Sequence, residues 1–110
     1  MAILKARTFV QACLRACNAE GIPATVVRHG YDEAGAVLIK LNQGAAGCSV
    51  LAQVRTMEGD LVWMRGTGPD CVPEQQADDY IGRQLRVDPD LWVIEVEDRK
   101  GRHPLGEKIL

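Results

Sequence analysis

Three acidic residues near the end of the chain, Glu95, Glu97 and Asp98, have the types and spacing closest to a chemical site. Glu95 and Glu97 are two residues apart, so on a β-strand they share one face. There, their carboxylates can bind a hard cation or raise each other's pKa. The simpler interpretation is a solvated strand end that resists edge pairing. We favour the simpler interpretation, because the sequence places no histidine or further acid beside these residues.

A second candidate is the segment that contains His29, Asp32 and Glu33. A histidine with two nearby acids can act as a general base or bind a metal. The same segment is rich in glycine and aspartate, which are typical of turns, so we favour turn formation as the explanation. A metal-dependent hydrolase or nuclease would need at least three of these groups, Glu95 and Glu97 included, to converge within about 5 Å of one point.

Cys71 is the candidate for a reactive thiol. It lies just before Pro73, at the expected start of a helix, where the helix dipole can lower the pKa of a thiol. If the thiol is reactive, alkylation should label it faster than an unfolded control. Cys13 and Cys17 are four residues apart and share a helix face, but they fall on its apolar stripe, where cysteine packs as a small hydrophobic residue. We therefore assign no metal ligand among the cysteines, and we expect no cofactor.

The last candidate is a basic cluster that could contact phosphate, formed by Arg99, Lys100, Arg102 and His103. A solvated C-terminal run beside three acids is the favoured interpretation. The net charge of −2 provides no overall positive field, so nucleic acid is an unexpected partner. No apolar run approaches the roughly 18 to 20 residues that span a bilayer, so no membrane partner is expected.

These residues must be positioned by one small domain. The chain has 110 residues, with 25% charged and 46% hydrophobic, which is ordinary globular usage. We expect a single domain over residues 1–103 and an extended or flexible tail over 104–110. The four cysteines, with no export signal, indicate reduced thiols in the cytoplasm.

Hydrophobic periodicity predicts an α+β fold in the order α-β-β-β-β-α-β. Thr8 and Gln11 resemble a capping box at the start of the first helix. We expect helices over 8–20 and 73–87, and strands over 24–29, 36–42, 48–55, 61–65 and 91–98.

Short connections between the first four strands favour a mainly antiparallel sheet of about five strands. The expected architecture has two layers, with both helices on one face of the sheet and a partly wet second face that includes Leu91 and Val93. The pairing of the last strand, parallel or antiparallel, stays open. The expected core is Val10, Leu14, Ile81, Leu85, Trp92, Ile94 and Val96.

Two segments carry a family resemblance. His-Gly-Tyr-Asp-Glu-Ala-Gly-Ala-Val-Leu-Ile-Lys-Leu-Asn at 29–42 and Arg-Val-Asp-Pro-Asp-Leu-Trp-Val-Ile-Glu-Val-Glu-Asp-Arg at 86–99 resemble a family of small uncharacterised alphaproteobacterial proteins of about 110 residues, a domain-of-unknown-function family. The resemblance covers nearly the whole chain and implies no activity, cofactor or catalytic residue.

The sequence does not contain a complete catalytic constellation. We therefore expect a bacterial, cytoplasmic, non-catalytic module that binds protein, either another chain or itself. Two alternatives stay open: a small metal-dependent hydrolase or nuclease that uses the acidic residues, and phosphate or RNA contact through the basic C-terminal cluster.

Overall fold

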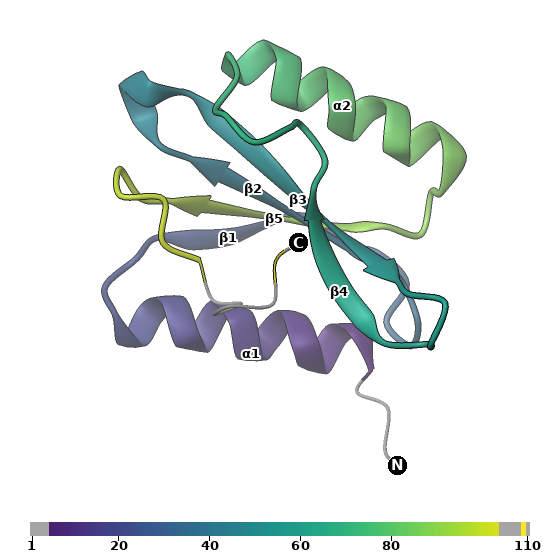
Figure 1. Ribbon diagram of the computed structural model, residues 1–110. Coiled ribbons are helices and arrows are strands. Elements are labelled where there is room, and N and C mark those ends of the chain that lie inside the picture. Colours follow the sequence, from purple (N-terminus) through teal and green to yellow (C-terminus); the bar gives the residue numbers. More distant parts are fainter. Residues whose placement is uncertain (1–4, 104–108, 110) are drawn as a thin grey trace.

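The computed structural model describes residues 5–103 and residue 109. Its helices and strands follow the expected order (Figure 1), and their ends differ from the expected ones by at most two residues. A short 3-10 turn, Gly44–Ala46, precedes the third strand. The elements are α1 (Ala6–Ala19), β1 (Ala24–Arg28), β2 (Val37–Asn42), β3 (Cys48–Arg55), β4 (Leu61–Arg65), α2 (Glu74–Val87) and β5 (Trp92–Glu97).

The five strands form one mixed sheet in the order β1-β5-β2-β3-β4. The last strand, β5, lies between β1 and β2, antiparallel to β1 and parallel to β2. The β2–β3 and β3–β4 pairs are antiparallel. The expectation of a mainly antiparallel sheet of five strands is thus confirmed. The pairing of the last strand, left open by the sequence, involves both directions.

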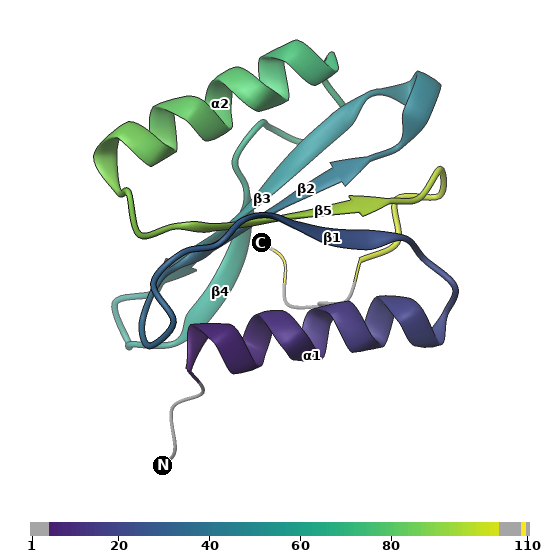
Figure 2. The ribbon, with the colours of Figure 1, turned by 180° about the vertical axis from the view of Figure 1, so that it is seen from behind.

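The two helices cover opposite faces of the sheet (Figures 1 and 2), so the expected two-layer arrangement with both helices on one face is wrong. The physical reason lies in the central strands. Residues 37–41 and 91–94 are almost continuously apolar, and a strand of that composition needs cover on both faces. Leu91 and Val93, expected on a wet face, are buried beneath α2.

Strand alternation divides the core into two clusters. Of the seven expected core residues, five are buried, while Leu14 and Leu85 are partly buried at the margins of the clusters. The α1 side contains Val10, Cys13, Cys17, Val37, Ile39, Leu41, Leu51, Trp63, Trp92, Ile94 and Val96. The α2 side contains Leu38, Cys48, Val50, Ala52, Ala77, Tyr80, Ile81, Leu91 and Val93.

The start of α1 corrects another expectation. The helix begins at Ala6 and has no side-chain cap, so Thr8 and Gln11 do not form a capping box. Instead, the backbone N–H of Arg7 donates to the carbonyl of Asp32 at 3.1 Å, which satisfies one of the free donors of the first turn. The β1–β2 loop thereby holds the helix start.

Two further findings concern the helices and the C-terminal residues. Neither helix in the described ranges has the length and apolar character that crossing a membrane requires. Most of the expected tail, 104–110, lies outside the described residues. Within it, Ile109 forms a parallel β-bridge with Trp63 of β4.

Candidate functional site

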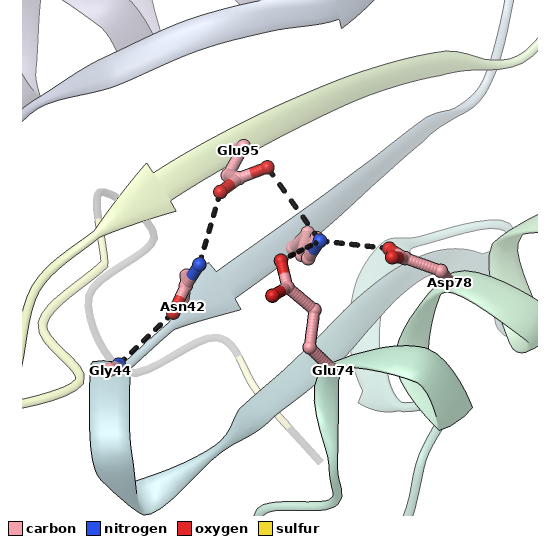
Figure 3. A network of polar contacts seen from close by, with 6 residues as sticks. Asn42, Gly44, Glu74, Asp78 and Glu95 are labelled. Carbon is pink, nitrogen blue, oxygen red and sulfur yellow. Dashed lines mark hydrogen bonds and ion pairs between the residues drawn. The ribbon is translucent and has the colours of Figure 1, made fainter.

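A buried lysine surrounded by three carboxylates is the most developed polar site in the described residues. Lys40, on β2, has a side chain only 7% exposed. Its Nζ lies 2.8 Å from Glu74 Oε2, 2.8 Å from Asp78 Oδ1 and 3.7 Å from Glu95 Oε1. Figure 3 shows the three carboxylates converging from α2 and β5. We call Lys40, Glu74, Asp78 and Glu95 the Lys40 cluster.

The topology explains this convergence. In the parallel β2–β5 register, Lys40 lies beside Glu95, so both side chains are on the face covered by α2. Glu74 and Asp78 are four residues apart in α2 and therefore share a helix face. Asn42 extends the network, since its amide donates to Glu95 Oε2 at 3.2 Å and its Oδ1 accepts the N–H of Gly44 at 3.0 Å (Figure 3).

The electrostatics fix the charge of the lysine. Burial alone would lower the pKa of Lys40, but hydrogen bonds to Asp78 and Glu74 and the nearby charge of Glu95 outweigh burial and raise the pKa above its usual value. A protonated Lys40 is attracted to all three carboxylates, so the Lys40 cluster joins α2 to β2 and β5.

Sequence reasoning missed Lys40 because its partners lie 34 and 38 residues away along the chain. One signal was available. The run of residues 37–41 is apolar except for this lysine, and a lone charge in a buried strand requires a partner.

Of the expected acidic pair, Glu95 and Glu97, only Glu95 contacts other polar side chains among the described residues. Glu95 is tied to Lys40 and Asn42, whereas Glu97, two residues later, is exposed. Within the described part of the chain, no group of three or more His, Cys, Asp or Glu residues is arranged to hold a metal ion. The convergence that a metal-dependent hydrolase requires is thus missing from these residues.

In the loop that follows β1, two of the three residues proposed for a general base or a metal site, His29 and Asp32, lie side by side. His29 Nε2 and Asp32 Oδ1 are 2.6 Å apart, and the His29 ring lies against Trp92 with centroids 4.0 Å apart. Glu33 turns instead to Lys5, with Oε1 at 3.5 Å from Nζ. Because Trp92 opens β5, this loop and Glu97 lie at opposite ends of the strand, roughly 16 Å apart at about 3.3 Å per residue.

Cys13 and Cys17 pack in the core, as expected. Cys13, Cys17 and Cys48 are buried, and burial, with a contribution from Cys17, raises the pKa of Cys13 to about 12. Cys71 is half-buried and precedes α2, which begins at Glu74. Its reactivity stays a prediction.

One member of the basic cluster, Arg102, forms an ion pair with Asp98. Arg102 donates from Nε to Asp98 Oδ2 at 2.9 Å and from Nη2 to Asp98 Oδ1 at 3.1 Å. Arg99 and Lys100 are exposed. His103 is half-buried, and burial, followed by the charge of Arg65, lowers its pKa. Of the four expected phosphate contacts, Arg99, Lys100 and Arg102 are exposed, and Arg102 is paired with Asp98.

Comparison with known proteins gives a consistent result. Residues 4–106 match the profile of a family described as protein of unknown function (DUF1491). The crystal structure of a DUF1491 family protein from Caulobacter crescentus CB15 has 35% identity over 98% of this chain and 100% of that chain, with a TM-score of 0.86. The NMR structure of a DUF1491 family protein from the same organism has 34% identity over 100% and 99% of the two chains, with a TM-score of 0.87.

A more distant solution structure, protein Atu0922 from A. tumefaciens, shares the fold, with 24% identity over 86% of this chain and 85% of that chain and a TM-score of 0.73. None of the curated proteins compared matches the chain. The organisms of these neighbours agree with the alphaproteobacterial resemblance of the two sequence motifs. The chain belongs to the DUF1491 family.

Proposed function

We propose that this protein is a non-catalytic interaction module that binds a second copy of itself along β1. The observation that carries the proposal is an exposed apolar edge strand. β1 lies at one end of the sheet and, in the described part of the chain, pairs with a strand on one side only. Its residues Thr25 to Arg28 are all exposed. Such an edge presents free backbone donors and acceptors to another strand.

The side chains of β1 favour association. Val26 and Val27 are 38% and 60% exposed, and Tyr31, in the following loop, is 53% exposed. The β1–β5 register shifts between Val26 and Arg28, where Val27 is the extra residue of a bulge. A bulge shortens the regular edge, so we expect a short contact and weak association rather than a permanent dimer.

A second copy suits this edge because two-fold symmetry pairs one strand antiparallel with itself. With Val26 on the symmetry axis, Arg28 lies opposite Ala24 of the other copy, and Thr25 lies opposite Val27. No like charges then face each other across the contact. The opposite edge, β4, already carries Ile109 beside Trp63, so β1 is the more open of the two.

Sedimentation velocity tests the proposal, with loading concentrations from about 10 μM to about 1 mM to cover weak association. The wild-type protein is expected to shift from monomer towards dimer. Val27→Lys should stay monomeric, because it places a charge in the contact. Val87→Lys is the matched control, since Val87 is 84% exposed at the end of α2. A wild-type protein that stays monomeric throughout, or a Val27→Lys variant that associates like wild type, would contradict the proposal.

The other candidate functions have less support. The acidic residues proposed for a metal-dependent enzyme are divided among three places: the Lys40 cluster, the exposed end of β5 with Glu97, and the loop after β1. The basic cluster proposed for phosphate or RNA contact has Arg102 bound to Asp98. For location, the four free cysteines support a reducing compartment, which we propose is the cytoplasm.

A further inference from the structure

The second sheet edge, β4, holds a residue from the end of the chain. On one side β4 pairs with β3. On the other side, Trp63 forms a parallel bridge with Ile109, and the Ile109 side chain packs partly buried against the α1-side core. Trp63 is 4% exposed, and its ring stacks with Phe9 at a centroid distance of 5.8 Å. Ile109 thus adds an aliphatic side chain to the core cluster that contains Trp63.

The remainder of this edge resembles a peptide-binding surface. Leu61 and Met64 are 46% and 40% exposed on either side of Trp63. Strand addition to an exposed edge draws affinity from backbone hydrogen bonds and specificity from pockets for alternate side chains. At β4, the backbone of Trp63 and the adjoining apolar core provide these two elements, and Ile109 uses both.

We infer that the β4 edge is a docking site for an extended peptide that runs parallel to β4 and places an aliphatic side chain beside Trp63. In the structure its occupant is Ile109, from the C-terminal end of the chain itself. A single β-bridge is a small contact that contributes little binding free energy by itself. Because Ile109 is covalently attached to the same chain, its effective concentration at the β4 edge is in the range of about millimolar, which favours its occupancy. The same segment supplied as a separate peptide must therefore compete with Ile109 for the site.

This site is separate from the proposed contact along β1, because β1 and β4 are opposite ends of the sheet. A failure of one proposal leaves the other standing. Substitutions at Ile109 and at Val27 therefore test different edges of the same molecule.

The test uses the full chain and a fluorescent synthetic peptide with the sequence of residues 103–110, and fluorescence anisotropy measures binding. The Ile109→Asp variant should bind this peptide at least about tenfold more tightly than the wild-type chain, whose own segment competes. A peptide with aspartate in place of its isoleucine should not bind. Met57→Asp makes the same type of change at a fully exposed residue in the β3–β4 turn and should bind like wild type.

Circular dichroism establishes that each variant is folded before binding is measured, and Ile109→Ala replaces Ile109→Asp if the latter unfolds. Tighter binding to the emptied site, lost with the aspartate peptide, supports the inference. A folded Ile109 variant that does not bind the peptide, or that binds both peptides equally, overturns it.

Discussion

Lys40 occupies a position where a central strand ordinarily carries an aliphatic side chain. Its stem is buried with the apolar residues of the α2 side, and its ammonium reaches two carboxylates of the first turns of α2. The charge is accommodated because three acids surround it and because Glu74 and Asp78 are about half exposed to water. The Lys40 cluster is therefore an ion-pair network that holds α2 against β2 and β5.

Lys40→Met removes the ammonium while keeping a similar apolar stem. We expect the free energy of unfolding to fall by about 1–2 kcal/mol, less than for a fully buried pair, because the orphaned carboxylates of α2 can hydrate. Urea denaturation measures the change. Lys100→Met, at an exposed residue, should stay within about 0.5 kcal/mol of wild type. Equal stability of the two variants would show that the Lys40 cluster contributes nothing.

Asp98 predicts a dependence of stability on pH. Hydrogen bonds from the Arg102 side chain and backbone lower the pKa of Asp98 from 3.8 to about 2. A depressed folded-state pKa stabilises the protein above the unfolded value, and this contribution is lost as the pH falls from about 4 to about 2. Asp98→Asn should therefore flatten the loss of stability across that interval.

Urea denaturation at a series of pH values from about 2 to about 6 tests this expectation. Glu97→Gln, which removes the neighbouring exposed carboxylate, is the control. Parallel pH profiles for wild type and Asp98→Asn would contradict the role given to the Asp98–Arg102 pair.

At the residue scale, the sequence can bring together only partners that are close along the chain. His29 and Asp32 are three residues apart and meet within one loop. The Lys40 cluster joins β2, α2 and β5, and its assembly depends on strand order and on which face α2 covers. Neither property follows from local spacing, so those partners could not be assigned from the sequence.

At the scale of elements, the two sequence motifs that carry the family resemblance contact each other. The β1–β2 loop lies on the start of β5, where the N–H of Tyr31 donates to the carbonyl of Asp90 at 3.0 Å. In return, Trp92 Nε1 donates to the carbonyl of Tyr31 at 2.9 Å. Gly30 and Gly35 allow this close approach. The motifs thus form one packing unit, in which His29 lies against the Trp92 ring.

Gly30→Ala should damage this unit. An added Cβ would lie 2.3 Å from the Asp90 carbonyl oxygen and 2.6 Å from Trp92 Cδ1, so backbone must shift. We expect a loss of about 1–3 kcal/mol, measured by thermal or urea unfolding. Gly82→Ala is the matched control, because the space around Gly82 in α2 is open, and alanine should stabilise that helix by about 0.5–1 kcal/mol. Similar effects of the two substitutions would contradict this packing account.

Element boundaries were predictable because turn signals and periodicity are local. Gly21, with φ of 71°, follows the end of α1, and all five strands lie where the apolar runs are. The placement of the helices was wrong because only one alternation of β5, with Trp92, Ile94 and Val96, was expected to be covered. The other alternation, with Leu91 and Val93, was expected on a partly wet face, whereas α2 covers it. Continuous apolar strands were the local evidence for two covered faces.

At the scale of the whole molecule, a helix–sheet–helix sandwich covers both faces of the sheet and leaves its edges as the surfaces with unsatisfied pairing capacity (Figure 2). The two edges differ. β4 receives Ile109 at Trp63, whereas β1 exposes Val26 and Val27. This asymmetry is the basis for assigning association to β1.

Hydrogen exchange measured by NMR as a function of protein concentration tests association along β1 most directly. Over about 10 μM to about 1 mM, the β1 amides that do not bond to β5 should become progressively protected as the strand pairs with a second copy. The β4 amides should not change, and Val27→Lys should abolish the concentration dependence. Exchange at Ala24–Arg28 that is independent of concentration in the wild-type protein would contradict the proposed function.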